Sequence, residues 1–179
     1  SYDAMIAEYF SAHDDDFPAR LTLALEKVAD LRYGENPHQR GAVYKFILPL
    51  PRIGGEGRGE GVAAAKQRSG NPVSYNNYQD ADGALQLVYE FSRPAAAIIK
   101  HANPCGCAEA DTLPAAMQAA WEADPVSRFG GIIATNRVID VATAGVFLAP
   151  NNKFDVVIAP GYEPEALALI RARKGWGST

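Results

Sequence analysis

Cysteine is scarce in this chain of 179 residues, because Cys105 and Cys107 are the only two. A single glycine separates them, and a disulfide across one intervening residue would be badly strained. We therefore expect both to be free thiols, which is the usual state of cysteine in a reducing cytoplasm. The sequence thus favours a cytoplasmic location.

Long apolar runs and an excess of basic residues are missing too. No run approaches the roughly 20 apolar residues that a membrane-spanning helix needs. Residues 1–10 carry two acidic side chains and no basic one, unlike a signal peptide. The formal net charge is −4, whereas nonspecific nucleic-acid binding relies on Lys and Arg that neutralise phosphates. We expect neither a membrane nor a nucleic acid as a partner, and a local anion site still fits this composition.

The apolar content, 47% of the residues, is enough for one sizeable core, and its pattern divides the chain. Residues 1–13 contain a short amphipathic helix, with apolar side chains at helical spacing. Residues 14–30 are expected to be a linker, with a weak strand pattern of alternating leucines. Five glycines and two prolines make 49–61 a flexible insertion. Residues 175–179 resemble a tail or a truncation scar, so we expect this chain to be part of a longer protein.

Beyond residue 74, buried apolar runs alternate with amphipathic segments. The apolar runs predict strands at 95–99, 131–134 and 154–159, after an earlier strand at 42–50. The segments between them predict helices at 80–91, 111–123, 140–148 and 163–173, the first capped by Asp80 or Asp82. This alternation predicts the α/β fold class, with a mainly parallel sheet and helices on its faces.

Polar chemistry follows the first of these buried strands, where Lys100 and His101 precede a turn. Ligands of open α/β sheets bind beyond the carboxyl ends of the strands, and residues 160–162 follow the third strand at the same predicted edge. Histidine is the common general acid or base near neutral pH. Because successive strand residues point to opposite faces, Lys100 and His101 can serve one site only if the strand ends at or before Lys100. The alternative is a lysine that reaches solvent beside a packed histidine.

A metal site is a competing hypothesis for the same region. His101, Cys105 and Cys107 partly match the His-x-Glu and Pro-Cys-x-x-Cys pattern of the zinc deaminases. The glutamate that acts as general acid and base is absent, and the cysteine spacing is one residue short. We therefore predict that no metal binds. Of the other histidines, His13 lies in an acidic segment and receives no role, and His38 lies in a turn, where structural and functional roles are equally consistent.

Two loops contain residue types that contact phosphate groups. In Arg32-Tyr33-Gly34, the guanidinium can fork onto phosphate oxygens and the glycine lets the backbone approach. Residues 127–131 precede a strand and form either a nucleotide-contacting loop or a simple turn. They lack the Gly-Lys-Ser/Thr of a Walker loop.

Five segments occur in the order found in one enzyme family. They are LRYGENPHQ at 31–39, VSYNN at 73–77, IIKHANPCG at 98–106, ADPVSRFGGIIATNR at 123–137 and VVIAPGYEPEAL at 156–167. Together they resemble the bifunctional purine-biosynthesis family AICAR transformylase/IMP cyclohydrolase. The segment YDAMIAEYF at 2–10 is similar to the last helix of the cyclohydrolase domain of that family. The resemblance implies that 1–13 end a cyclohydrolase domain and that 31–174 form the first half of a transformylase domain.

The resemblance also implies an activity, that of phosphoribosylaminoimidazolecarboxamide formyltransferase. Such an enzyme transfers the formyl group of 10-formyltetrahydrofolate to the 5-amino group of AICAR (5-aminoimidazole-4-carboxamide ribonucleotide), giving FAICAR, without a metal. The family implies a cytidine-deaminase-like α/β half and a homodimer with active sites at the subunit interface. Lys100 and His101 match the catalytic pair of the family. The implied nucleotide-binding residues are Arg32, Tyr33, Asn77, Phe129, Gly130 and Asp155.

Several features depart from the family pattern, among them the glycine-rich insertion at 53–61 and the segment 145–153. Arg128 stands where the family has a small residue beside the Phe-Gly contact. The second half of the transformylase domain, which in the family supplies an essential asparagine and much of the folate pocket, is not among these residues. The alternative prediction is therefore a truncated, non-catalytic half-domain that binds nucleotide or dimerises.

Overall fold

The computed structural model describes residues 25–46 and 61–173. The predicted helix in 1–13, most of the predicted linker, all but Gly61 of the predicted insertion, the tail and His13 lie outside the described residues.

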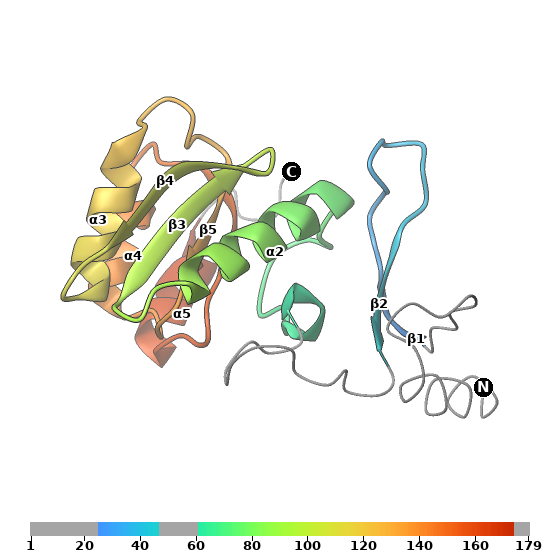
Figure 1. Cartoon of the computed structure of the whole chain (residues 1–179), viewed down its shortest axis with the longest axis horizontal. Helices are drawn as coiled ribbons and strands as arrows, with labels where there is room; N and C mark the ends of the chain where they lie inside the picture. The colour runs from blue at the N-terminus through green and yellow to red at the C-terminus, as the bar shows by residue number, and fades with distance from the viewer. Residues whose placement is uncertain (1–24, 47–60, 174–179) are drawn as a thin grey trace, which may run out of the picture.

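A two-stranded antiparallel ribbon comes first in the described chain. β1 (Leu25–Asp30) pairs with β2 (Ala42–Phe46), with an irregular register between Lys27 and Ala29. The last six residues of the predicted linker form this first strand, in the segment where alternating leucines gave a weak strand pattern. The ribbon lies to one side of the larger body (Figure 1).

The larger body is built on a four-stranded sheet in the order β4-β3-β5-β6. Its strands are β3 (Ala95–Lys100), β4 (Asn103–Glu109), β5 (Gly131–Thr135) and β6 (Phe154–Ile158). Helices accompany the sheet on both faces, and the α/β fold class is confirmed. The prediction of a mainly parallel sheet is wrong, because β3 is antiparallel to both of its neighbours and only β5 and β6 are parallel.

The direction of β3 follows from β4, a strand that the sequence pattern does not indicate. β4 begins at Asn103, and this residue pairs with Lys100, so the chain reverses in a tight hairpin instead of crossing over through a helix. Pro104 and Gly106 make the segment look like a turn. A proline is tolerated in β4 because β4 is an edge strand.

Helices cover the two faces of the sheet unequally (Figure 1). α2 (Tyr75–Tyr89) and the short 3₁₀ helix η1 (Gly61–Ala64) pack on one face. α3 (Leu113–Ala123), α4 (Val141–Leu148) and α5 (Pro164–Ala172) pack on the other. Among the helices of 25–46 and 61–173, none has the length and apolar character needed to cross a membrane.

The first helix of the body begins earlier than predicted. Ser74 caps α2, because its hydroxyl accepts a hydrogen bond from the backbone N–H of Asn77 at 3.3 Å. Neither Asp80 nor Asp82 is the cap, since both lie inside the helix. Their carboxylates are free to accept hydrogen bonds from other segments, and Asp82 does so from the backbone N–H of Val62 at 3.3 Å.

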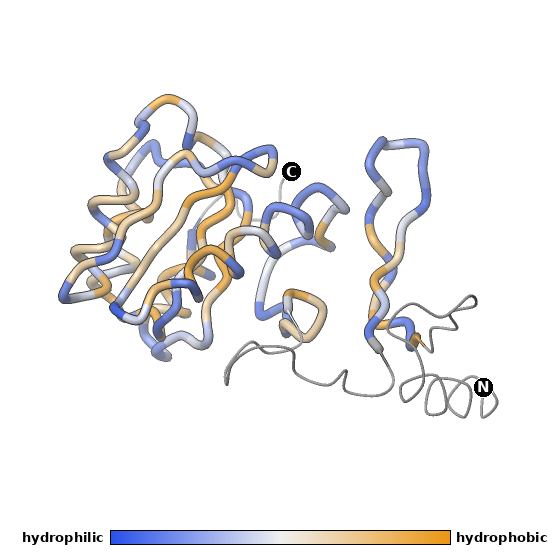
Figure 2. The backbone as a smooth tube through the Cα atoms, viewed as in Figure 1, coloured by the Kyte–Doolittle hydropathy of each residue, from blue (hydrophilic) through white to orange (hydrophobic). Residues whose placement is uncertain are grey.

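The two faces of the central strand β3 support separate apolar clusters. Ala96 and Ile98 pack with the cluster under α3, α4 and α5, whereas Ala97 and Ile99 pack with the cluster under α2. All residues from Ala95 to Ile99 are buried, as their continuous apolar run predicts. Figure 2 shows hydrophobic residues along the strands in the middle of the sheet.

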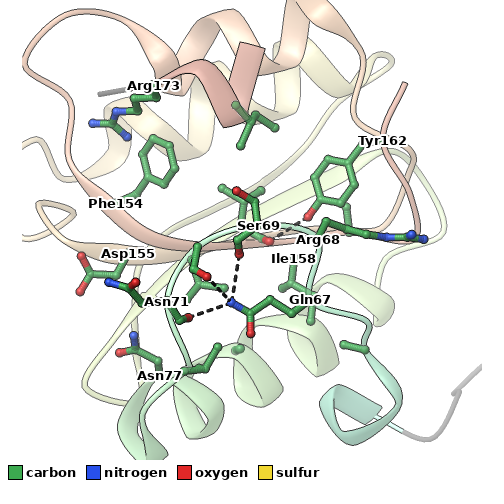
Figure 3. Close-up of a pocket in the computed structure, with 18 of the residues that line it drawn as sticks. Gln67, Arg68, Ser69, Asn71, Asn77, Phe154, Asp155, Ile158, Tyr162 and Arg173 are labelled. Carbon is green, nitrogen blue, oxygen red and sulfur yellow. Dashed lines mark hydrogen bonds between the residues drawn. The ribbon is translucent and has the colours of Figure 1, made fainter. Parts of the chain in front are cut away.

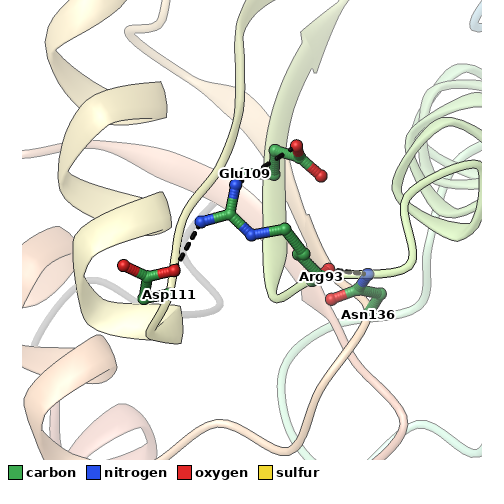
Figure 4. A network of polar contacts seen from close by, with 4 residues as sticks. All are labelled: Arg93, Glu109, Asp111 and Asn136. Carbon is green, nitrogen blue, oxygen red and sulfur yellow. Dashed lines mark hydrogen bonds and ion pairs between the residues drawn. The ribbon is translucent and has the colours of Figure 1, made fainter.

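Buried Asn136 ties the start of β3 to the end of β5 (Figure 4). Its side-chain oxygen accepts from the backbone N–H of Ala95 at 2.8 Å, and its amide group donates to the carbonyls of Phe91 at 3.0 Å and Arg93 at 2.8 Å. The Arg93 guanidinium in turn donates to Asp111 at 2.6 Å. The polar side chains of Asn136, Arg93 and Asp111 thus stabilise the fold at this end of the sheet.

Candidate functional site

The antiparallel direction of β3 places Lys100 at the end of the sheet where β5 and β6 begin. Its ammonium group donates a hydrogen bond to the carbonyl oxygen of Phe129, with an Nζ to O distance of 2.8 Å. Residues 160–162, which follow β6, lie at the opposite end, so the predicted shared edge is wrong. Lys100 instead shares its end of the sheet with Phe129, Gly130 and Asp155.

An open cavity of about 1390 Å³ runs along the edge strand β6 (Figure 3). The segment 62–73 forms one wall, and α2 and α5 contribute residues to the lining. Figure 3 places Asp155 and Asn77 at the same side of this cavity. Five of the residues predicted from the sequence line it: Arg32, Tyr33, Asn77, Phe129 and Asp155.

The cavity wall is basic although the chain as a whole is acidic. Asp155 is the only carboxylate among the described lining residues. The lining also includes five basic side chains: Arg32, Lys66, Arg68, Lys153 and Arg173. This balance favours an anionic ligand, and guanidinium groups in particular match the geometry of phosphate.

Arg32 and Tyr33, which both line the cavity, contact each other. The Arg32 guanidinium lies 5.0 Å from the centre of the Tyr33 ring and donates to its hydroxyl at 3.4 Å. The hydrogen bond from Arg32, followed by one with Ser74, lowers the pKa of the Tyr33 phenol, and the negative charge of Asp155 acts in the opposite sense. Both predicted residues therefore belong to the same local electrostatic environment as Asp155.

The loop before β5 presents an aromatic ring to solvent. Phe129 is 55% exposed, and the Lys153 ammonium lies 5.5 Å from the centre of its ring. Gly130 follows with φ +77, and its backbone N–H donates to the carbonyl of Lys153 at 2.9 Å. A residue with a Cβ would be strained at this φ, so glycine keeps the backbone open beside the exposed ring.

His101 lies on the hairpin turn that follows Lys100. β3 ends at Lys100, and His101 leaves strand geometry with φ 53, which is the condition for both side chains to serve one site. The carboxylate of Asp80 on α2 holds this turn by accepting hydrogen bonds from the backbone N–H groups of His101 and Ala102. Sequence reasoning missed Asp80. Its position three residues after Asn77, on the same face of the helix, could have revealed it.

A second feature that sequence reasoning missed is the loop that forms the cavity wall. The side-chain amide of Gln67 donates to three successive carbonyls, those of Ser69 at 3.0 Å, Gly70 at 3.1 Å and Asn71 at 2.8 Å (Figure 3). Arg171 of α5 donates to the carbonyl of Arg68 at 2.7 Å. These bonds hold the loop in a defined conformation across from β6.

Arg128, which departs from the family pattern, contacts α3. Its guanidinium lies 4.7 Å from the centre of the Trp121 ring and donates to the carbonyl of the same residue. Arg128 is not among the residues that line the cavity. The substitution therefore attaches the loop before β5 to the core helix and leaves Phe129 free to face the cavity.

The two cysteines lie on opposite faces of the sheet. A bulge in β4 near Cys105 shifts the alternation of its side chains, so Cys105 packs against the cluster under α3 and Cys107 against the cluster under α2. One metal ion cannot bind both thiols in this arrangement. Among the described residues, no group of three or more His, Cys, Asp or Glu side chains is placed to hold a metal ion.

We expect both thiols to react slowly with iodoacetamide in the folded chain. Burial raises the pKa of Cys105 and of Cys107, so less of the reactive thiolate is present at pH 7.5. Alkylation followed by mass spectrometry should be at least about tenfold slower than in the urea-unfolded chain. Equal rates would contradict this prediction. Stoichiometric zinc that survives chelator washing and is lost in Cys105→Ser would restore the metal hypothesis.

Comparison with known proteins gives a consistent result along the chain. The sequence model of one family, described as AICARFT/IMPCHase bienzyme, matches residues 1–176. A relative from Halalkalibacterium halodurans, named bifunctional purine biosynthesis protein PurH, is 47% identical over 179 residues. Its namesake from Bacillus subtilis is 44% identical over 176 residues. Each alignment covers 97% of this chain and 32% of the relative, so the chain spans about a third of the length of these relatives.

Proposed function

This chain belongs to the AICARFT/IMPCHase bienzyme family, and from that premise we propose that it supplies part of the formyl-transfer site of an enzyme of purine biosynthesis. The substrates are AICAR and 10-formyltetrahydrofolate. We assign the described body to the first of the two cytidine-deaminase-like halves of the transformylase domain. The observation that carries the proposal is the basic cavity along β6, because five site residues predicted from the sequence line it.

The nucleotide occupies this cavity in our proposal. Its phosphate is held by Arg32, whose guanidinium is fixed over the Tyr33 ring and can fork onto phosphate oxygens. Asn77 and Asp155, from α2 and β6, offer hydrogen-bonding groups at the same side of the cavity (Figure 3). The exposed ring of Phe129 offers an apolar face to the base. These residues orient the 5-amino group toward Lys100 and His101.

The chemistry requires one proton acceptor and one cation. The amine of AICAR is a weak nucleophile because its lone pair is delocalised toward the carboxamide. His101 in its neutral form takes a proton from this amine as the nitrogen attacks the formyl carbon. Lys100 stabilises the charge that develops on the formyl oxygen, and an ammonium group has three donors, of which Phe129 engages one. The bond from the formyl carbon to the folate nitrogen then breaks, and that nitrogen leaves with the proton that His101 took from the amine, which returns His101 to its neutral form.

The remaining parts of the proposal concern partners and location. We propose a homodimer with the site near the subunit interface, since His101 and Phe129 are exposed in the single chain and the folate must be held as well. The free thiols of Cys105 and Cys107 support a cytoplasmic location. A second candidate function is a half-domain that binds nucleotide without chemistry, which the basic cavity along β6 supports as well.

Two measurements test the proposal and separate it from this alternative. Calorimetry of the 179-residue chain with AICAR should detect binding. A hybrid enzyme in which residues 1–179 replace the matching segment of the Bacillus subtilis relative should transfer the formyl group from 10-formyltetrahydrofolate to AICAR. Binding by the chain together with an inactive hybrid would favour the non-catalytic half-domain. No binding and no transfer would overturn both functions.

Arg32→Ala is expected to raise the KM of the hybrid enzyme for AICAR by about tenfold while kcat changes less than about twofold. The lost charge-assisted hydrogen bond contributes about 1.5–3 kcal/mol to binding, and it is present in both the ground state and the transition state. Arg40→Ala removes an exposed arginine from the same loop and should leave KM unchanged. Equal KM values for the two variants would remove Arg32 from the nucleotide site.

A further inference from the structure

Both carboxylate oxygens of Asp80 accept hydrogen bonds from the backbone of the turn that carries His101. Oδ2 accepts from the N–H of His101 at 3.2 Å, and Oδ1 accepts from the N–H of Ala102 at 2.7 Å. On the other side of the turn, the side-chain amide of Asn103 donates to the carbonyl of His101 at 2.8 Å. The backbone N–H of His101 is therefore hydrogen-bonded to Asp80, and its carbonyl is hydrogen-bonded to Asn103.

The turn needs such support because its backbone conformation is unfavourable for its residues. Lys100 and Asn103 are paired, which leaves a hairpin loop of two residues, His101 with φ 53 and Ala102 with φ 60. Loops of this kind require positive φ at both positions and favour Asn-Gly or Gly-Gly. Positive φ is uncommon for residues other than glycine. Here neither residue is glycine, so an external contact must contribute to holding the conformation.

The N–H groups of His101 and Ala102 could find hydrogen-bond partners other than Asp80. The N–H groups of a two-residue loop face outward, where water can accept their hydrogen bonds, and His101 and Ala102 are both exposed. The carboxylate replaces water at these two groups with an acceptor on α2. Asp80 lies one helical turn after Asn77 and next to Ala81, both of which line the cavity. The hydrogen bonds thus fix the position of the turn relative to the helix that forms the cavity wall.

We propose that Asp80 is a positioning residue for His101, holding the turn against α2 so that the imidazole stays in place beside the nucleotide. This inference rests on the proposed function of the cavity. Asp80 itself touches neither substrate nor reacting atoms, and it acts only through the backbone of His101 and Ala102. Geometry of this kind affects rate strongly, because small displacements of a reacting group slow a reaction.

The first test measures the turn itself and does not depend on activity. Asp80→Asn keeps the size of the side chain but leaves one oxygen acceptor for two N–H groups. In the 179-residue chain, amide hydrogen exchange at His101 and Ala102, followed by NMR, should accelerate by about tenfold or more. The matched control is Asp140→Asn, which changes an aspartate that accepts a backbone N–H at the start of α4, from Thr143 at 2.7 Å. Unchanged exchange at the turn in Asp80→Asn would overturn the proposal.

The second test measures the consequence for catalysis in the hybrid enzyme. Asp80→Asn should lower kcat by about tenfold and change the KM for AICAR by less than about twofold, whereas Asp140→Asn should leave both unchanged. Ala102→Gly in the Asp80→Asn background should restore much of the lost kcat, because glycine adopts positive φ without support.

The outcomes distinguish this proposal from the proposed function. If the hybrid is inactive but Asp80→Asn accelerates amide exchange, formyl transfer is contradicted. The hydrogen bonds from the turn to Asp80 are then still supported. An active hybrid in which Asp80→Asn accelerates exchange but keeps its kcat would overturn the positioning role. A parallel rise in KM, or no rescue by Ala102→Gly, would also overturn it.

Discussion

Replacing His101 by alanine is expected to lower the kcat of the hybrid enzyme by about 10²-fold or more, the usual scale for the loss of a general base. Among the described residues of the β3–β4 turn next to Lys100, only His101 has a side chain that can take a proton from the amine near neutral pH. AICAR binding should weaken much less, because the lost interaction belongs mainly to the transition state. Steady-state kinetics at saturating AICAR and folate give kcat, and calorimetry gives the binding constant.

His38→Ala is the matched control for this experiment. His38 is also an exposed histidine in a turn. Neither His38 nor His101 is among the residues that line the cavity along β6, but only His101 follows Lys100 on the β3–β4 turn. Replacing His38 should change kcat by less than about twofold, whereas near-normal turnover in His101→Ala would remove His101 from the mechanism. The prediction for His101 is larger than that for Asp80, since Asp80→Asn only displaces the imidazole that His101→Ala deletes.

The turn that carries Lys100 and His101 shows how the sequence can indicate a strand and still assign it the wrong neighbours. The sequence placed Lys100 directly after a buried strand, and the structure makes it the last residue of that strand. The rule that ligands bind beyond the carboxyl ends of parallel strands then predicted the wrong neighbours, because β3 is antiparallel to β5. Lys100 meets Phe129 at the start of β5 instead. Only the matched segments of the family, and not the periodicity of the strands, indicated that these two residues belong together.

The strands that could be predicted are those whose burial leaves a pattern. Ala95 to Ile99 and Gly131 to Ala134 are continuous apolar runs because both faces of β3 and β5 are covered. β4 has no such pattern, since it is an edge strand that contains Pro104, a bulge and Gly106. The role of Asp80 left only a weak signal, its spacing of three residues from Asn77, because the residues it binds are 21 and 22 positions away in the sequence.

Gly106→Ala is expected to cost about 3 kcal/mol of folding free energy or more. Gly106 is buried in β4, where α3 crosses the strand. A Cβ at this position would overlap the carbonyl oxygen of Ala120 and lie 2.9 Å from its carbonyl carbon. Overpacking a core costs about 1–3 kcal/mol and occasionally more. The high end applies here, because the obstacle is helix backbone rather than a flexible side chain. Urea unfolding of the 179-residue chain, followed by circular dichroism, measures the change.

Gly145→Ala is the matched control, because it makes the same chemical change with the opposite expected sign. Gly145 lies inside α4, and a Cβ there would meet nothing within 4 Å. Alanine favours a helix interior over glycine by about 0.5–1 kcal/mol, so this variant should be more stable than the parent. If Gly106→Ala lowers the free energy of unfolding by less than about 1 kcal/mol, the loss is below the range for an overpacked core. Such a result would mean that α3 can move away from β4. The close approach of helix and strand would then not be what restricts position 106 to glycine.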